Sequence, residues 1–212
     1  MKFGIYSIYQ ALQPRFRAKR RRLFLQRFRP TETTTILDVG GNVYDWTDVA
    51  TASQITIVNV APTDPWGACQ GRFTYQQGDG RALPFEAQSF DIVYCNSVIE
   101  HLRTLEDQRK LAAECLRVGR CVFVQTPNRW FPVEPHFVTV FLHYFPKRIQ
   151  RPLYRFLSVR GLFRKNDDVD LTALFEELRL LTPNEMRALF PKCEIYKERL
   201  LGMPKSLIAM RV

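Results

Sequence analysis

The sequence has few cysteines and no long apolar run, and these absences exclude several classes of protein. Its five cysteines are scattered and include no C-x-x-C pair, so neither a disulfide framework nor a zinc site is expected. No apolar stretch approaches the roughly 20 residues that a membrane-spanning helix needs. Residues 1–13 lack the apolar core and small-residue cleavage site of a signal peptide. We therefore expect a cytoplasmic protein with reduced thiols and no bound metal.

The whole chain carries a net charge of +10, and two of its parts have almost no acidic residues. Residues 2–29 contain nine lysines and arginines and no acid. Residues 129–165 contain eight lysines and arginines and a single acid, Glu134. The rest of the chain is net negative. Positive charge concentrated in two segments indicates an anionic partner more strongly than a high overall pI does.

Strand and helix patterns alternate through most of the chain. Short apolar runs between turn residues predict five strands, and helical periodicity predicts the helices between them. This alternation predicts a doubly wound, mostly parallel α/β sheet. The 212 residues, 46% of them hydrophobic, suffice for one core and an insertion. The expected strands are 35–39, 55–60, 72–77, 89–95 and 121–124, and the expected helices are 43–52 and 105–118.

The first part of the chain predicts a basic helical segment over residues 1–30. Apolar side chains recur near helical spacing in residues 14–29, among several arginines, and Pro14 suits a first helical position. We therefore start this helix at Pro14. The remaining residues, 31–212, predict one domain.

The end of the chain predicts a capped helix and an antiparallel strand pair. Thr182, Pro183 and Glu185 match a capping box with proline at the first helical position, which predicts a helix over 183–190. Two apolar runs that flank a Gly-Met-Pro turn predict the strand pair, over 193–201 and 206–212.

An aromatic and basic segment, residues 129–180, separates these parts and contains no clean strand pattern. We expect it to form a lid insertion built of helices. In residues 147–160, apolar side chains recur at helical spacing and basic side chains occupy other faces. Such a helix either packs its apolar stripe on the core or binds an anionic membrane surface, an anionic acceptor or nucleic acid, in that order of preference.

The strand and turn at residues 36–42 predict a site for a nucleotide-type cofactor. A buried strand ends at Asp38 and Val39, and Gly40 and Gly41 would admit a ligand close to the backbone, where a Cβ would collide. Asn59 ends the next strand, 21 residues past Asp38, where a side chain can reach a ribose. The turn lacks G-x-G-x-x-G, which disfavours a dinucleotide oxidoreductase.

Four sequence blocks, in a fixed order, carry a resemblance to a known family. They are Leu-Asp-Val-Gly-Gly at 37–41, Gly-Asp-Gly-Arg-Ala-Leu-Pro-Phe at 78–85, Ser-Phe-Asp-Ile-Val at 89–93 and Asn-Ser-Val-Ile-Glu-His-Leu at 96–102. Together with the closing strand pair, they resemble class I S-adenosylmethionine-dependent methyltransferases, nearest the type 11 small-molecule subgroup. The resemblance implies a Rossmann-like, mostly parallel seven-stranded sheet with a C-terminal antiparallel strand pair. It also implies methyl transfer to a small-molecule, glycan or lipid-linked acceptor, with oxygen the favoured acceptor atom.

The resemblance also implies a place for the polar residues of each block. Asp38 would lie near the amino-acid moiety of the cofactor, and Asp79 would accept from the adenine amine. The family usually has Asp or Glu where this chain has Asn59, so we expect cofactor binding weaker by about 1 kcal/mol, because an amide makes no charge-assisted hydrogen bond. The predicted cofactor-binding residues are Asp38, Gly40, Gly41, Asn42, Asn59, Asp79, Gly80, Arg81, Asn96 and Ser97.

Two histidines are the predicted catalytic residues. His101 follows the fourth strand, and it either faces the transferred methyl or has a purely structural role. His136 lies near Glu134 in a proline-rich loop after the fifth strand, where family members place substrate-facing residues. Alignment supplies much of the catalysis with an activated sulfonium, and a general base helps when the acceptor is a hydroxyl.

Two other functions stay open at this point. Asn59 fits a protein that keeps the fold as a non-catalytic binding module. The run from Lys19 to Arg22 fits a nucleic-acid methyltransferase, but no Asn/Asp-Pro-Pro-aromatic motif follows the fourth strand. We therefore expect a small-molecule or lipid-linked substrate and peripheral contact with an anionic membrane surface, and nucleic acid is disfavoured.

Overall fold

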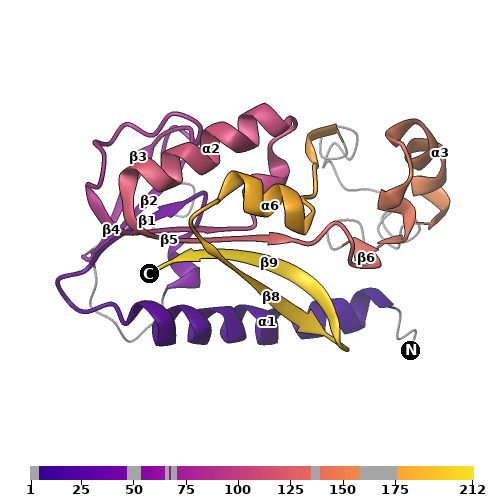
Figure 1. The fold of residues 1–212 in the computed structure, drawn as a ribbon, viewed down its shortest axis with the longest axis horizontal. Helices are drawn as coiled ribbons and strands as arrows, with labels where there is room; N and C mark the ends of the chain where they lie inside the picture. Colours follow the sequence, from indigo (N-terminus) through magenta and orange to yellow (C-terminus); the bar gives the residue numbers. More distant parts are fainter. Residues whose placement is uncertain (1–4, 47–53, 65–66, 68–70, 135–138, 158–175) are drawn as a thin grey trace.

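A computed structural model describes the chain except for residues 1–4, 47–53, 65–66, 68–70, 135–138 and 158–175. A seven-stranded sheet forms the centre of the described part (Figure 1). Its strands are β1 (Thr35–Val39), β2 (Gln54–Asn59), β3 (Phe73–Gln77), β4 (Phe90–Asn96), β5 (Gly119–Pro127), β8 (Glu194–Leu200) and β9 (Met203–Arg211).

The strand order is β3-β2-β1-β4-β5-β9-β8. The first five strands are parallel, and β9 pairs antiparallel with both β5 and β8. This arrangement confirms the predicted fold class and the closing antiparallel pair. The chain progresses outward from β1 through β2 to β3, and then starts again on the other side of β1 with β4. Such a reversal separates the loops that follow β1 and β4 and opens a crevice at their carboxyl ends.

Helices cover both faces of the sheet (Figure 1). α2 (Leu105–Val118) and α6 (Pro183–Leu189) lie on one face, and α1 (Ile5–Phe28) lies on the other. α2 has the predicted bounds, and the predicted capping box of Thr182 and Glu185 is present at the start of α6. Hydrogen bonds from these caps satisfy backbone N–H groups that the first turn of a helix leaves unpaired.

The basic helix α1 is packed against the sheet and is part of the core. Phe24 is fully buried, and its ring contacts the rings of Trp46, Tyr94 and Phe123. Burying one such side chain contributes about 1.5–3 kcal/mol. The aromatic contacts explain why this segment, despite its charge, folds onto the sheet.

The predicted start of this helix at Pro14 is wrong, because α1 begins at Ile5 and Pro14 lies inside it. Proline is favoured in the first turn of a helix, but it can also occur inside a helix, where it costs about 3 kcal/mol. No glycine or other proline lies between Ile5 and Pro14 to stop the helix. Packing of the later turns, through Phe16 and Phe24, offsets this cost.

The insertion lies beyond the end of β5 (Figure 1). It contains the antiparallel pair β6 (Val133–Glu134) and β7 (Thr139–Val140), the short 3-10 helix η3 (Leu142–Tyr144) and the helix α3 (Lys147–Leu157). The expected helices are present as η3 and α3, and β6 and β7 add a strand pair that the sequence did not predict. Two-residue strands are too short to give a periodic signal in a sequence.

Two further expectations fall partly outside the described residues. The helix predicted over 43–52 begins as a 3-10 helix, η1 (Val43–Asp45), and residues 47–53 lie outside the described part. The helix predicted in 147–160 is present to Leu157. Among the described helices, none has the length and apolar character needed to cross a membrane.

Candidate active site

A cavity of about 240 Å³ opens at the carboxyl ends of β1, β2, β3 and β4. We call it the strand-end cavity. It brings together residues from turns that are far apart in the sequence, as the reversal of strand order predicts. The predicted site residues that line it are Gly40, Asn59, Asp79, Gly80, Arg81, Ser97 and His101.

Two glycines let the backbone form the wall of this cavity. Gly40 has φ of +70°, and a Cβ there would lie 2.6 Å from Cγ2 of Val98. A Cβ on Gly80 would lie 2.5 Å from Cδ1 of Leu111. Any side chain at Gly40 would also be strained, because positive φ disfavours residues with a Cβ. Side chains of the protein itself therefore require both glycines, and the sequence prediction that the glycine turn admits a ligand remains a prediction.

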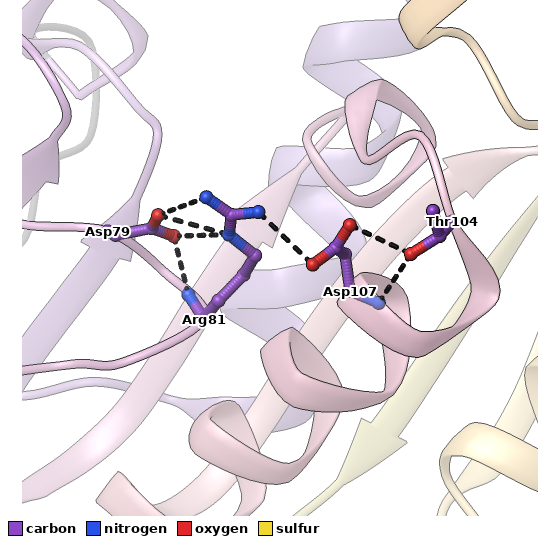
Figure 2. Close-up of polar contacts among 4 residues, drawn as sticks. All are labelled: Asp79, Arg81, Thr104 and Asp107. Carbon is purple, nitrogen blue, oxygen red and sulfur yellow. Dashed lines mark hydrogen bonds and ion pairs between the residues drawn. The ribbon is translucent and has the colours of Figure 1, made fainter.

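Asp79 is held by Arg81 at the edge of the strand-end cavity (Figure 2). Its two carboxylate oxygens accept four hydrogen bonds from the Arg81 backbone N–H and guanidinium, at 2.6–3.0 Å. These bonds lower the pKa of Asp79. A carboxylate has about four lone-pair sites. An adenine amine at Asp79 would therefore share or displace a bond from Arg81.

The other end of Arg81 ties the same loop to helix α2. Its Nη1 donates to Asp107, at 3.1 Å, and Thr104 caps the first turn of α2 through Asp107 (Figure 2). Hydrogen bonds from Thr104 and Arg81 lower the pKa of Asp107. Arg81 thus joins the turn after β3 to the start of α2 and fixes the shape of this side of the cavity.

Asn59 lies at the end of β2, where the sequence places a ribose-binding residue. Its Oδ1 already accepts a hydrogen bond from the backbone N–H of Val60, at 2.8 Å. The amide NH2 of Asn59 is then the group best suited to a ligand hydroxyl, as a donor. This geometry supports the expectation of weaker ribose binding than a carboxylate would give.

Asp38 and Asn42 make internal contacts. Asp38 is 1% exposed, and Trp46 Nε1 donates to its Oδ2 at 2.7 Å. Burial raises the pKa of Asp38 to about 7, and the hydrogen bond from Trp46 opposes this effect. Asn42 caps η1 and donates to Asp45. Neither Asp38 nor Asn42 is among the described residues that line the strand-end cavity.

Gly41 packs directly on the Asp38 carboxylate. A Cβ on Gly41 would lie 1.8 Å from Oδ2 of Asp38. The second glycine of the turn is therefore needed because a larger residue would collide with the Asp38 side chain. The sequence prediction that it admits a ligand remains a prediction.

Arg20 of helix α1 reaches the ends of β4 and β5, a contact that the sequence did not predict. Its Nη1 donates to Asn96 Oδ1 at 2.8 Å and to Gln125 Oε1 at 2.7 Å. Ser97 Oγ donates to the same Gln125 oxygen at 2.9 Å. Ser97 has φ of +57° and lines the strand-end cavity. The basic helix thereby helps to hold the turn that forms one wall of the cavity.

A second cavity, also of about 240 Å³, lies within the insertion. We call it the insertion cavity. His143 and Glu134 line it, and Glu134 is 1% exposed. His143 Nε2 lies 3.0 Å from the carbonyl oxygen of Arg129, and burial lowers the pKa of this imidazole. His143 was missed at the sequence level because it lies in a run of aromatic residues, and the predicted His136 lies outside the described residues.

Hydrogen bonds at one short segment link the walls of the two cavities. His101 ends the 3-10 helix η2 (Ile99–His101) and lines the strand-end cavity. The backbone N–H of Arg179, which lines the insertion cavity, donates to the carbonyl oxygen of Glu100 at 2.7 Å. Gln108 donates to the carbonyl oxygens of both Ile99 and Arg179. The wall of one cavity is thus bonded to the wall of the other.

Comparisons with known proteins support the family resemblance. Residues 37–121 match a family model described as a methyltransferase domain. No curated protein matches the chain in sequence. The matched range contains every predicted cofactor-binding residue and His101, and it includes the four blocks on which the resemblance was based. The predicted family is therefore confirmed over this range.

Solved structures share the fold at low sequence identity. A provisionally named Zn-dependent alcohol dehydrogenase from Rhodobacter sphaeroides is 16% identical, with a TM-score of 0.61 over 91% of this chain and 87% of that one. A chain of the complex between the Haloferax volcanii Trm112 methyltransferase activator and a methyltransferase is 11% identical, with a TM-score of 0.56 over 96% and 92%. At such identities the likeness shows the fold alone.

Phosphoethanolamine N-methyltransferase 2 from Haemonchus contortus, in complex with S-adenosyl-L-methionine, is 16% identical to the chain. Its TM-score is 0.55, and the match covers 84% of this chain. The chain spans only 38% of the length of that protein. The resemblance is therefore to one domain of a longer enzyme.

The residues of the strand-end cavity fit S-adenosylmethionine, the cofactor of this family. Asp79 is an ionised acceptor of the kind that an adenine amine needs. Gly40 and Gly80 bring the backbone to the cavity wall, and Asn59 and Ser97 add polar side chains. Residues 37–121 of this chain match the model of a methyltransferase domain, and the lining of the strand-end cavity fits the S-adenosylmethionine that such domains use.

Proposed function

We propose that this protein transfers the methyl group of S-adenosylmethionine to a hydroxyl oxygen of a small-molecule, glycan or lipid-linked acceptor. The observation that carries this proposal is the position of His101, which lines the same cavity as Gly40, Asn59 and Ser97. A histidine beside the cofactor can accept the hydroxyl proton. A neutral amine could attack the methyl group through its lone pair without first losing a proton, whereas a hydroxyl becomes a better nucleophile as its proton leaves.

The chain's own residues would act mainly by alignment. The bound cofactor supplies a methyl group on an activated sulfonium, so the protein must orient the acceptor and exclude water. Ser97 and the glycine turn at Gly40 border the cavity on one side, and Asn59 and Asp79 border it on the other. His101 would take the proton that the acceptor hydroxyl loses, through an imidazole nitrogen.

Exposed side chains of the insertion support a lipid-linked acceptor and peripheral binding to an anionic membrane surface. Trp130, Phe141 and Phe145 are 59%, 53% and 51% exposed. Arg148, at the start of α3, is exposed in the same segment. Aromatic and basic residues together favour the interface of an anionic bilayer. The corresponding location would be the cytoplasmic surface of a membrane.

Calorimetry with S-adenosylmethionine and S-adenosylhomocysteine tests the cofactor. We expect saturable binding of both, and folded protein that binds neither at millimolar concentration would contradict the proposal. Asn59→Asp should tighten binding about tenfold, as a charge-assisted hydrogen bond adds about 1–2 kcal/mol. If binding is undetectable until Asn59 is replaced, the alternative of a non-catalytic binding protein is favoured.

His101→Asn separates catalysis from binding. The variant should bind S-adenosylhomocysteine as the native protein does, because the amide occupies similar space. Methyl transfer to a hydroxyl acceptor should fall by about 100-fold or more, which is the usual contribution of a general base. Unchanged transfer in this variant would remove His101 from the mechanism.

Flotation with liposomes tests the membrane surface. The native protein should float with vesicles that contain anionic lipid and remain unbound with neutral vesicles. Trp130→Ser and Phe141→Ser together should weaken flotation, whereas Tyr44→Ser, at a residue 60% exposed outside the insertion, should leave it unchanged. Equal behaviour of both vesicle types would contradict membrane binding.

A further inference from the structure

The insertion cavity contains the features of a binding site for an anion. We propose that this cavity binds a carboxylate or phosphate group of the methyl acceptor, and that Arg129 recognises that group. The identification of the ligand as the acceptor rests on the proposed methyltransferase function. The presence of an anion site rests on the cavity and its charges alone.

The cavity has room for a chemical group of moderate size. Its volume is about 240 Å³. About 10–15 Å³ of such volume holds one water molecule, and ligand pockets begin at about 300 Å³. The space therefore suits the head group of a small molecule. Its lining also contains polar side chains, among them Thr139 and Gln150, so the cavity is not a dry, purely apolar void.

The charged side chains of the lining favour an anion. Three are cationic, those of Arg129, Lys147 and Arg179, and one is anionic, that of Glu134. Arg179 is neutralised by Glu185, which its Nη2 contacts at 2.5 Å. Lys147 donates to the carbonyl oxygen of Glu176.

Arg129 is the cation best placed to recognise the anion. In the described part of the chain, no carboxylate forms an ion pair with its guanidinium, which lies 5.8 Å from the ring centroid of Trp130. The Arg129 backbone is fixed at both ends, because its N–H donates to the Leu181 carbonyl and its own carbonyl accepts from His143. A planar guanidinium on a fixed backbone suits bidentate binding of a carboxylate or phosphate.

His143 is not a second cation at this site. Its Nε2 lies 3.0 Å from a carbonyl oxygen, which only accepts, so Nε2 carries the hydrogen. Burial lowers the pKa of the ring, which therefore stays neutral at pH 7. The anion is left to Arg129, with the buried Glu134 limiting the excess positive charge.

Apolar side chains line the rest of the cavity. Leu142, Phe145, Leu178 and Leu180 contribute to it. A ligand with one anionic group and an apolar or ring-shaped body would match both parts of the lining. Arg179 also joins this wall to Glu100, beside His101 of the strand-end cavity, so a hydrogen bond links the walls of the two cavities.

Calorimetric titration with small aromatic probes tests the proposal on the full chain. Phenyl phosphate and benzoate are the two anionic probes, and benzyl alcohol is the neutral probe of similar shape. We expect at least one anionic probe to bind about tenfold more tightly than benzyl alcohol, as charge-assisted hydrogen bonds allow. Comparison of phenyl phosphate with benzoate identifies the class of anion.

Variants at two arginines locate the binding. Arg129→Gln should weaken binding of the anionic probe about tenfold or more, and Arg129→Lys, which keeps the charge but loses the fork, should have a smaller effect. Arg148→Gln is the matched control, because Arg148 is exposed on α3 and is not among the described lining residues. Equal affinity for neutral and anionic probes, or native affinity in Arg129→Gln, would overturn the proposal.

Binding of S-adenosylhomocysteine is measured in the same samples. Native affinity for it in Arg129→Gln would show that the variant is folded and that the lost anion binding is local. Loss of both would assign Arg129 a role in folding and would also overturn the proposal. Failure of the native chain to bind S-adenosylhomocysteine would contradict the proposed function. It would not affect the test of the anion site, because the probes bind without a cofactor.

Discussion

The buried carboxyl group of Asp38 makes a quantitative prediction about stability and pH. Burial raises its pKa from 3.8 to about 7. Between these values the folded protein holds a proton that the unfolded chain has lost, so the free energy of unfolding falls as the pH rises through this window. The resulting penalty is about 2 kcal/mol at about pH 5 and about 4 kcal/mol at about pH 8.

Asp38→Asn removes this penalty and keeps the structure around it. The asparagine side chain cannot ionise, and its Oδ1 can still accept the hydrogen bond from Trp46 Nε1. The variant should therefore be more stable than the native protein. Its advantage should be larger at about pH 8 than at about pH 5, by about 2–3 kcal/mol.

Urea denaturation of both proteins at the two pH values measures this difference. Asp91→Asn is the control, because hydrogen bonds from Thr35 lower the pKa of Asp91. The stability that ionised Asp91 contributes is present above its unfolded pKa, so this control should lose the same stability at both pH values. An Asp38→Asn advantage that does not change with pH would refute the reasoning.

Three further substitutions test the packing around the site by urea denaturation. Arg20→Met leaves Lys205 as the cation near the buried Glu198 and should cost about 1–3 kcal/mol, whereas exposed Arg22→Met should change stability by less than about 0.5 kcal/mol. Gly41→Ala forces the Asp38 carboxylate to move and should cost about 1–3 kcal/mol. Thr182→Ala breaks the capping box of α6 and should cost about 1 kcal/mol. Values near zero for any of the three would contradict the corresponding contact.

The sheet and the order of the site residues were predictable because their signals are local. Apolar runs bounded by turn residues gave the five parallel strands within a few residues of their observed bounds, and the Gly40 turn marked the end of β1. Thr182 and Glu185 are three residues apart, so their capping box is readable directly. The antiparallel pair β8 and β9 followed from the turn between them.

Other features depend on contacts between residues far apart in the chain. Arg20 lies in a run of four basic residues, and its neighbour Arg22 is exposed. Only the rotation of α1 on the sheet selects Arg20 to contact Gln125, 105 residues away. In the same way, the position of Trp46 after the turn decides that Asp38 accepts a hydrogen bond inside the protein.

The sequence by itself determined the family, the mostly parallel sheet and the turns that meet at the carboxyl ends of its strands. Those properties follow from periodicity and short motifs, which act over a few residues. Only the tertiary structure decided which polar groups are buried and paired, and where the two cavities lie. Burial and pairing depend on how helix α1 and the insertion pack against the sheet, which no local pattern specifies.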